Sequence, residues 1–201
     1  MIANVLSYYS LIVQKIYRLA LFQVLWFCFT LCGGIILGLF PSTYALLEMS
    51  RQTEDLQLKE YIQQYKKHFV YAFKKTNKAG VVYLIMLFLM GMNLFIFNEL
   101  FIMQMVVLGC MFLILLMILY FLLFFNNELT VIHQWKQSLG NVFLHPKNNL
   151  LYVTILIGGY IVSQFSPGLA IFFSVSIAAR LIAKISVSTH EEYGNRERIL
   201  K

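Results

Sequence analysis

The sequence predicts an all-α, polytopic membrane protein with about five transmembrane helices and one amphipathic interfacial helix. The first observation is the uncharged run 101–125, in which Gln104 is the one strongly polar side chain. At about 1.5 Å per residue, a helix of this length crosses the roughly 30 Å hydrocarbon core of a bilayer. The second observation is the composition, which is 60% hydrophobic and only 12% charged, unlike that of a soluble domain. We therefore expect residues 1–201 to form a single membrane domain.

Four further apolar runs predict the remaining spans. Residues 79–97 precede the first run, and the polar pair Asn98-Glu99 separates the two, so together they predict a transmembrane hairpin. The polar loop 126–149 predicts a short interfacial helix that ends before Pro146, and residues 186–201 form a charged tail. The last two spans meet at Ser166-Pro167-Gly168, a sequence typical of a turn. The first of these two spans is short, so a tilted helix, a locally thinned bilayer and a shallow hairpin are all open alternatives. The other predicted spans are 19–39, 150–165 and 169–185.

The first span, 19–39, ends in a glycine-rich stretch. Gly34 and Gly38 are four residues apart, a spacing that lets a second helix approach closely. Pro41 is expected to end or bend the helix at Phe40 because it lacks an amide proton, and Ser42 and Thr43 are expected to cap the next helical segment. The alternative is a re-entrant segment that lines a cavity. The candidate helix-packing or partner face consists of Gly34, Gly38, Pro41 and Thr43.

Residues 53–78 change to a helical period and become basic. Apolar side chains recur at spacings of three and four, which places them on one face of a helix; they are Leu58, Ile62, Tyr65, Phe69 and Phe73. We expect this helix to lie on the membrane surface, and the alternative is that it docks to a partner protein by the same face. The membrane-surface basic face consists of Lys59, Lys66, Lys67, Lys74, Lys75 and Lys78.

The distribution of basic residues predicts the topology. The net charge is +7, which in a membrane protein indicates contact with anionic cytoplasmic lipid rather than nucleic acid. With five spans and the N-terminus outside, every Lys and Arg except Lys15 and Arg18 lies on the cytoplasmic side, as the positive-inside rule requires. A re-entrant first segment would place all 16 basic residues inside. The prediction is a multi-pass protein of the cell membrane with a cytoplasmic C-terminus.

Polar residues inside the apolar runs form a candidate polar path, and they are Asn93, Gln104 and Arg180. The two amides can form hydrogen bonds between helices or contact a solute. The Arg180 side chain can extend to the membrane surface or pair with a carboxylate such as Glu99 or Glu128. The four histidines stand in different polar segments, and the sequence contains no Gly-rich phosphate loop or nucleophile elbow. We predict no catalytic residue, no metal site and no cofactor, and hence a protein that is not an enzyme.

Three short motifs carry a family resemblance. They are Gly38-Leu-Phe-Pro41-Ser42-Thr43-Tyr-Ala45, Phe73-Lys74-Lys75 within the basic helix, and Leu144-His145-Pro146 before the last spans. In these motifs the chain resembles the YesL-like family of bacterial integral membrane proteins of unknown function. The resemblance implies a small bacterial plasma-membrane protein, often encoded beside carbohydrate ABC transport systems. It implies no catalytic residues.

We expect one of two functions. The first is a non-enzymatic accessory or regulatory protein that packs against a partner such as a carbohydrate ABC permease. The alternative is a small solute transporter or channel that acts as a homo-oligomer, because five short spans enclose little volume.

Overall fold

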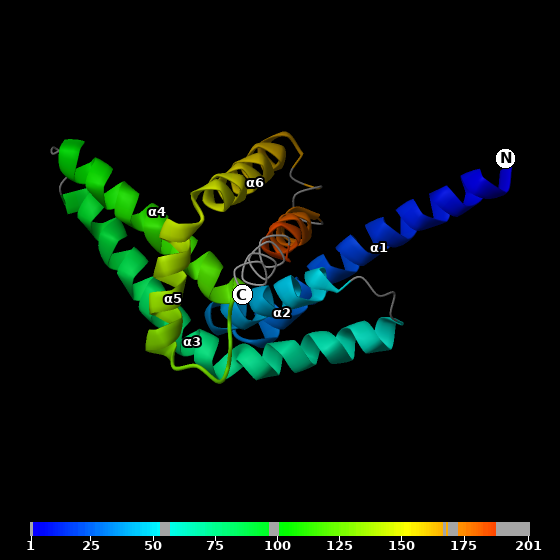
Figure 1. Cartoon of the computed structure of the whole chain (residues 1–201), viewed down its shortest axis with the longest axis horizontal. Coiled ribbons are helices and arrows are strands. Elements are labelled where there is room, and N and C mark those ends of the chain that lie inside the picture. The colour runs from blue at the N-terminus through cyan, green and yellow to red at the C-terminus, as the bar shows by residue number, and fades with distance from the viewer. Residues whose placement is uncertain (1, 53–56, 97–100, 167, 169–172, 188–201) are drawn as a thin grey trace, which may run out of the picture.

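The computed structural model describes residues 2–52, 57–96, 101–166, 168 and 173–187, with side chains from residue 12 onward. Six helices occur in chain order, and residues 173–187 form a further one, called here the 173–187 helix (Figure 1). Within these ranges every regular element is helical, which confirms the all-α prediction. The helices are α1 (Ile2–Cys32), α2 (Ile36–Arg51), α3 (Leu58–Ile96), α4 (Phe101–Leu123), α5 (Val131–Leu144) and α6 (Pro146–Phe165).

Three of the described helices are long and apolar enough to cross a membrane. They contain the segments Ile12–Cys32, Leu58–Ile96 and Phe101–Leu123, so the chain has the character of a membrane protein. The predicted count of five spans stays a prediction. The fourth expected span falls on α6, and the fifth overlaps the 173–187 helix, although residues 169–172 lie outside the described part.

The predicted first span, 19–39, is interrupted by a sharp turn. Helix α1 ends at Cys32, and the amides of Gly34 and Ile35 donate to the carbonyls of Leu31 and Thr30, each at 3.0 Å. Gly34 has a φ of 81° and Ile35 a φ of 51°, a left-handed conformation that a β-branched residue rarely adopts. The chain therefore reverses within the apolar run, and the prediction of one continuous span is wrong.

The reversal brings α2 back against α1 at contact distance. A Cβ atom added to Gly38 would lie 2.2 Å from the Thr30 carbonyl oxygen, and one added to Gly33 would lie 2.4 Å from the Cα of Gly38. Only glycine leaves room for two backbones this close. The pair α1–α2 is thus a tight antiparallel hairpin.

Pro41 does not end a helix, so of the two effects predicted for it, an end or a bend, the first is wrong. Helix α2 runs through it, and Ser42 and Thr43 lie in the helix interior rather than at a cap. Proline leaves the Leu37 carbonyl without its usual amide partner and costs about 3 kcal/mol in a helix interior. Pro41 is fully buried, so packing around this part of α2 offsets the cost.

Helix α3 combines two elements that the sequence separated. The predicted amphipathic helix 53–78 and the span 79–97 form one helix of 39 residues, which is roughly 58 Å long; residues 53–56 and 97 lie outside the described part. The buried stripe of α3 packs within the chain, on α1 and α2 along most of its length and on α4 and α5 at Tyr83, so this stripe is not free for lipid or a partner, contrary to the prediction. It comprises Tyr61, Tyr65, Phe69, Ala72, Thr76, Ala79, Gly80 and Tyr83, while Leu58 and Ile62 are exposed.

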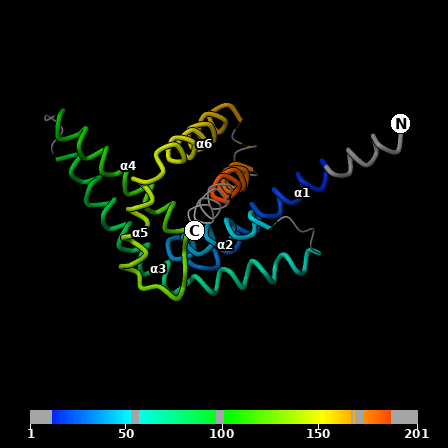
Figure 2. Tube along the Cα trace, in the orientation of Figure 1, coloured from blue at the N-terminus to red at the C-terminus, as the bar shows by residue number. Residues whose placement is uncertain are grey.

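Helices α3 and α4 form the predicted hairpin, which extends away from the other helices (Figures 1 and 2). Helix α5 returns against α4, begins with the Thr130 hydroxyl accepting the His133 amide at 3.4 Å, and ends before Pro146 as predicted. The loop before α5 is held to α3 by Lys75, whose Nζ donates to the carbonyls of Asn127 and Leu129. This loop therefore fixes the base of the hairpin.

Replacing Gly38 with leucine tests the close contact between α1 and α2. The new side chain would meet backbone that cannot move aside, so we expect G38L to lower the free energy of unfolding by about 3 kcal/mol or more. Thermal unfolding in mild detergent measures the effect. The matched control is G91L in α3, where a Cβ would meet nothing within 4 Å. Equal stability of the two variants would contradict the contact.

Candidate functional site

The candidate site is built on α2, which lies between α1 and α3 and reaches the end of α4. Its sequence contains the Gly-Leu-Phe-Pro-Ser-Thr-Tyr-Ala motif, and both polar and apolar side chains of this motif are buried. Because a helix that is enclosed on most sides must satisfy its polar groups internally, these contacts define the site. The buried residues of α2 are Gly38, Phe40, Pro41, Ser42, Tyr44, Ala45, Leu46, Leu47 and Met49.

Ser42 and Tyr65 form the centre of a polar network. The Tyr65 hydroxyl donates to the Ser42 carbonyl at 2.7 Å and lies 2.9 Å from the Ser42 hydroxyl. The Ser42 hydroxyl in turn donates to the Trp26 carbonyl at 2.9 Å. Tyr65 and Ser42 both have no exposed surface. One buried hydroxyl pair therefore connects α1, α2 and α3.

Trp26 adds a second link between the first two helices. Its indole Nε1 donates to the Thr43 hydroxyl at 3.1 Å, and that hydroxyl donates to the Leu39 carbonyl at 2.7 Å. Thr30 donates to the Trp26 carbonyl at 2.7 Å. The polar side chains of Trp26, Thr30, Ser42 and Thr43 therefore all find hydrogen-bond partners within the protein.

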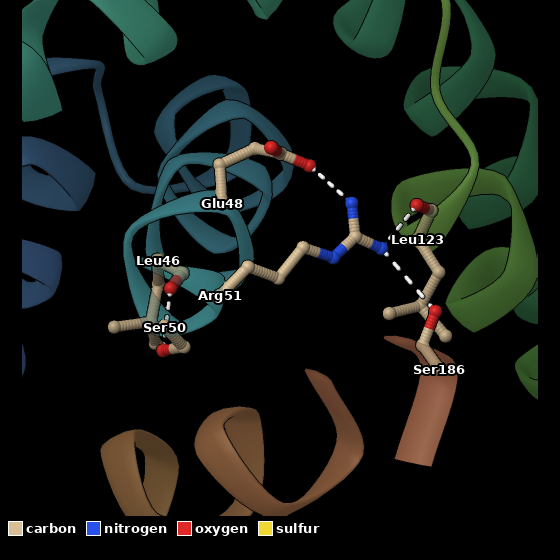
Figure 3. Close-up of polar contacts among 6 residues, drawn as sticks. All are labelled: Leu46, Glu48, Ser50, Arg51, Leu123 and Ser186. Atoms are coloured by element: carbon tan, nitrogen blue, oxygen red, sulfur yellow. Dashed lines mark hydrogen bonds and ion pairs between the residues drawn. The ribbon is translucent and has the colours of Figure 1, made fainter. Parts of the chain in front are cut away.

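Arg51, the last residue of α2, joins three parts of the chain (Figure 3). Its Nη1 atom is 2.5 Å from the Glu48 carboxylate, and its Nη2 atom donates to the Leu123 carbonyl at 2.5 Å and to the Ser186 hydroxyl at 3.4 Å. Leu123 ends α4, where a cation is favourable because the helix dipole is negative there. We call Arg51, Glu48, Leu123 and Ser186 the Arg51 junction.

A buried glutamine fixes the other end of the 173–187 helix. Gln23 in α1 is 6% exposed, and its side-chain oxygen accepts the Ser176 amide at 3.0 Å. The 173–187 helix is thus attached to α1 by Gln23 and to α2 by Arg51.

The candidate helix-packing residues lie together on the α1–α2 hairpin, but in different roles. Gly38 contacts Thr30, Pro41 is in the core, and Thr43 binds Trp26. Gly34 lies in the turn, where an added Cβ would meet nothing within 4 Å. Gly34 and Gly38 therefore do not form one stripe, and the close pair is Gly33 with Gly38.

The residues of the candidate polar path lie on three different helices. Asn93 donates to the Leu89 carbonyl of its own helix at 2.8 Å, and Gln104 and Arg180 are half-buried on α4 and on the 173–187 helix. Asn93 and Gln104 belong to the α3–α4 hairpin, which points away from the 173–187 helix (Figure 1), and a shared polar path stays a prediction. On the basic face, Lys75 turns to the loop before α5, and the exposed members are Lys59, Lys66, Lys67, Lys74 and Lys78.

Sequence reasoning missed three residues of the site. In the sequence Arg51 is one of several basic loop residues, Gln23 lies inside an apolar run, and Tyr65 belongs to an apolar stripe. A signal existed for Gln23, because a polar side chain inside an apolar segment needs a partner. For Arg51 the signal is its separation of three residues from Glu48.

These contacts hold helices together and present no reactive group. Within the described residues, no group of three or more His, Cys, Asp and Glu side chains is placed to hold a metal ion. The chemistry of the site is thus hydrogen bonding and charge pairing inside a helical assembly. The fold and the site define an all-helical membrane protein organised around a buried, proline-containing helix.

One comparison with known families is informative. Residues 19–94 match the family described as "Protein of unknown function, DUF624", a segment that covers the C-terminal part of α1, all of α2 and nearly all of α3. YesL is a member of this family, so the match supports the resemblance at the level of the family. No curated protein and no solved structure matches the chain.

Replacing Arg51 with glutamine tests the Arg51 junction. R51Q leaves Glu48 without its cation and releases Leu123 and Ser186, so we expect a cost of about 1–2 kcal/mol, reduced by partial solvent exposure. Hydrogen exchange followed by mass spectrometry should show faster exchange in the 173–187 helix and at the end of α4. The control K136Q changes an exposed lysine. Unchanged exchange in R51Q would show that the junction does not hold these helices.

Proposed function

We propose that the protein is a non-enzymatic membrane accessory or regulatory protein. The observation that carries this proposal is that polar side chains of the apolar helices bond within the chain. Gln23, Ser42, Thr43 and Asn93 all do so. A solute path requires polar groups that face a shared space, whereas these groups serve helix packing.

The α3–α4 hairpin is the surface we propose for partner binding. On α3 an apolar stripe recurs at spacings of three, four and three residues, and its side chains are exposed: Ile85, Phe88, Met92 and Phe95. Phe88 is 67% and Phe95 89% exposed, and large aromatic side chains are typical anchors of interfaces. The α3–α4 hairpin extends beyond the other helices (Figure 2), so a partner helix can reach this stripe.

The partner class we propose is the permease of a carbohydrate ABC transport system in a bacterial cell membrane. The support for this class is the resemblance of the chain to the YesL-like family and the family match over residues 19–94. A membrane permease presents apolar helices at the same depth as the α3 stripe, so helix packing between the two is physically suitable.

The test is purification of the tagged full chain from its own host in mild detergent, with co-eluting proteins identified by mass spectrometry. We expect a membrane permease in near-stoichiometric amount. The double variant F88A/F95A should reduce its recovery at least about tenfold, because truncating interface anchors typically costs about 2 kcal/mol or more. The control F165A changes an equally exposed aromatic residue on α6 and should retain the partner.

A contrary outcome is recovery of the protein alone or as a homo-oligomer, with N93L and Q104L abolishing a solute-dependent phenotype. That result would replace the accessory proposal with the transporter alternative.

A further inference from the structure

An apolar groove lies between α6 and the 173–187 helix. Its volume is about 530 Å³, within the range of roughly 300–1,000 Å³ typical of ligand sites. Its two polar side chains are Thr154 and Ser174, and the Thr154 hydroxyl already donates to the Leu150 carbonyl at 2.8 Å. The groove therefore suits an apolar chain rather than a polar solute.

The two walls of the groove run in opposite directions and converge at the Arg51 junction. Ser186, near the end of the 173–187 helix, accepts from Arg51. Tyr152, near the start of α6, packs its ring 5.8 Å from that of Tyr120, in the last turn of α4, which ends at Leu123 of the junction. The start of α6 and the end of the 173–187 helix are thus at the same end of the groove (Figure 1).

Helical periodicity places one lysine from each wall at that end. On α6 the groove residues Thr154 and Gly158 continue backwards through Leu151 to Lys147, at spacings of three or four residues. On the other wall, Ile177 and Leu181 continue forwards to Lys184. Both lysines are exposed. The groove is therefore apolar along its length and cationic at one mouth.

The dimensions match one leaflet of a bilayer. The α6 residues that line the groove extend from Thr154 to Val162, which is about 12 Å of helix, against about 15 Å for half of the hydrocarbon core. Lys147 lies roughly 10 Å further along α6, where its stem can carry the ammonium to headgroup level.

We propose that this groove binds one acyl chain of an anionic phospholipid, with the lipid phosphate held by Lys147 and Lys184. Charge complementarity selects the headgroup, because the two ammonium groups attract a phosphate whose charge is not neutralised, whereas a cationic choline beside the phosphate would be repelled by them. The apolar walls select the chain. This site is separate from the α3 stripe proposed for a partner protein.

The test is native mass spectrometry of the full chain in mild detergent, with phosphatidylglycerol and phosphatidylcholine of identical acyl chains added in turn. We expect phosphatidylglycerol to be retained preferentially. The double variant K147Q/K184Q should lose this preference, with binding weaker by on the order of fivefold for each lysine. The control K15Q/K136Q removes two exposed lysines, one on α1 and one on α5, and should bind like the native chain.

Filling the groove gives an independent readout. A Cβ on Gly158 would meet nothing within 4 Å, so G158F should fold, occupy the groove and reduce binding of both lipids. The control G109F adds the same ring at an open position of α4 and should not. Equal retention of the two lipids with no effect of K147Q/K184Q would overturn the proposal. A G158F variant that changes the oligomeric mass but not lipid retention would also overturn it, because the occupant would then be a second copy.

Discussion

The close contact between Gly38 and the Thr30 carbonyl is the constraint on which the rest of the structure depends. It requires the chain to reverse at Gly34 and Ile35, so that α2 returns along α1 in the middle of an apolar run. A helix returned in this way lies inside the assembly, where water cannot satisfy its polar groups. The buried network of Ser42 and Tyr65 and the Arg51 junction both result from that position.

The buried position of α2 also explains how it accommodates a proline. Pro41 removes one hydrogen bond from α2, but the surrounding helices supply others, since Tyr65 donates to the Ser42 carbonyl one residue later. Aromatic packing adds to this, with the Phe29 ring 5.0 Å from Tyr65 and 5.2 Å from Phe69. Contacts from α1 and α3 thus stabilise a helix whose own sequence disfavours it.

Several elements were predictable because local signals decide them. The apolar run of α4, the polar break before it and the end of α5 at Pro146 each depend on residues close in sequence. The α1–α2 reversal could not be predicted in this way, because Gly33-Gly34 in an apolar run is equally compatible with a continuous helix. Tertiary packing decides between the two conformations. The sequence raised a re-entrant segment as the alternative to a span, and that alternative stays a prediction. The roles of Arg51 and Gln23 could not be predicted because their partners are distant in sequence: Leu123 and Ser186 for Arg51, and Ser176 for Gln23.

The most direct test is the distance between the two ends of the α1–α2 hairpin. Nitroxide labels at Y17C and Q52C, on a chain whose three native cysteines are replaced with serine, report this distance by pulsed electron paramagnetic resonance in detergent or bilayers. Helices packed as an antiparallel pair have axes about 8–10 Å apart, so we expect a label separation of roughly 10–25 Å. If residues 19–39 were one continuous helix and the chain continued in the same direction to residue 52, the labels would be about 50 Å apart. A distance in that longer range would contradict the hairpin and, with it, the buried position of α2.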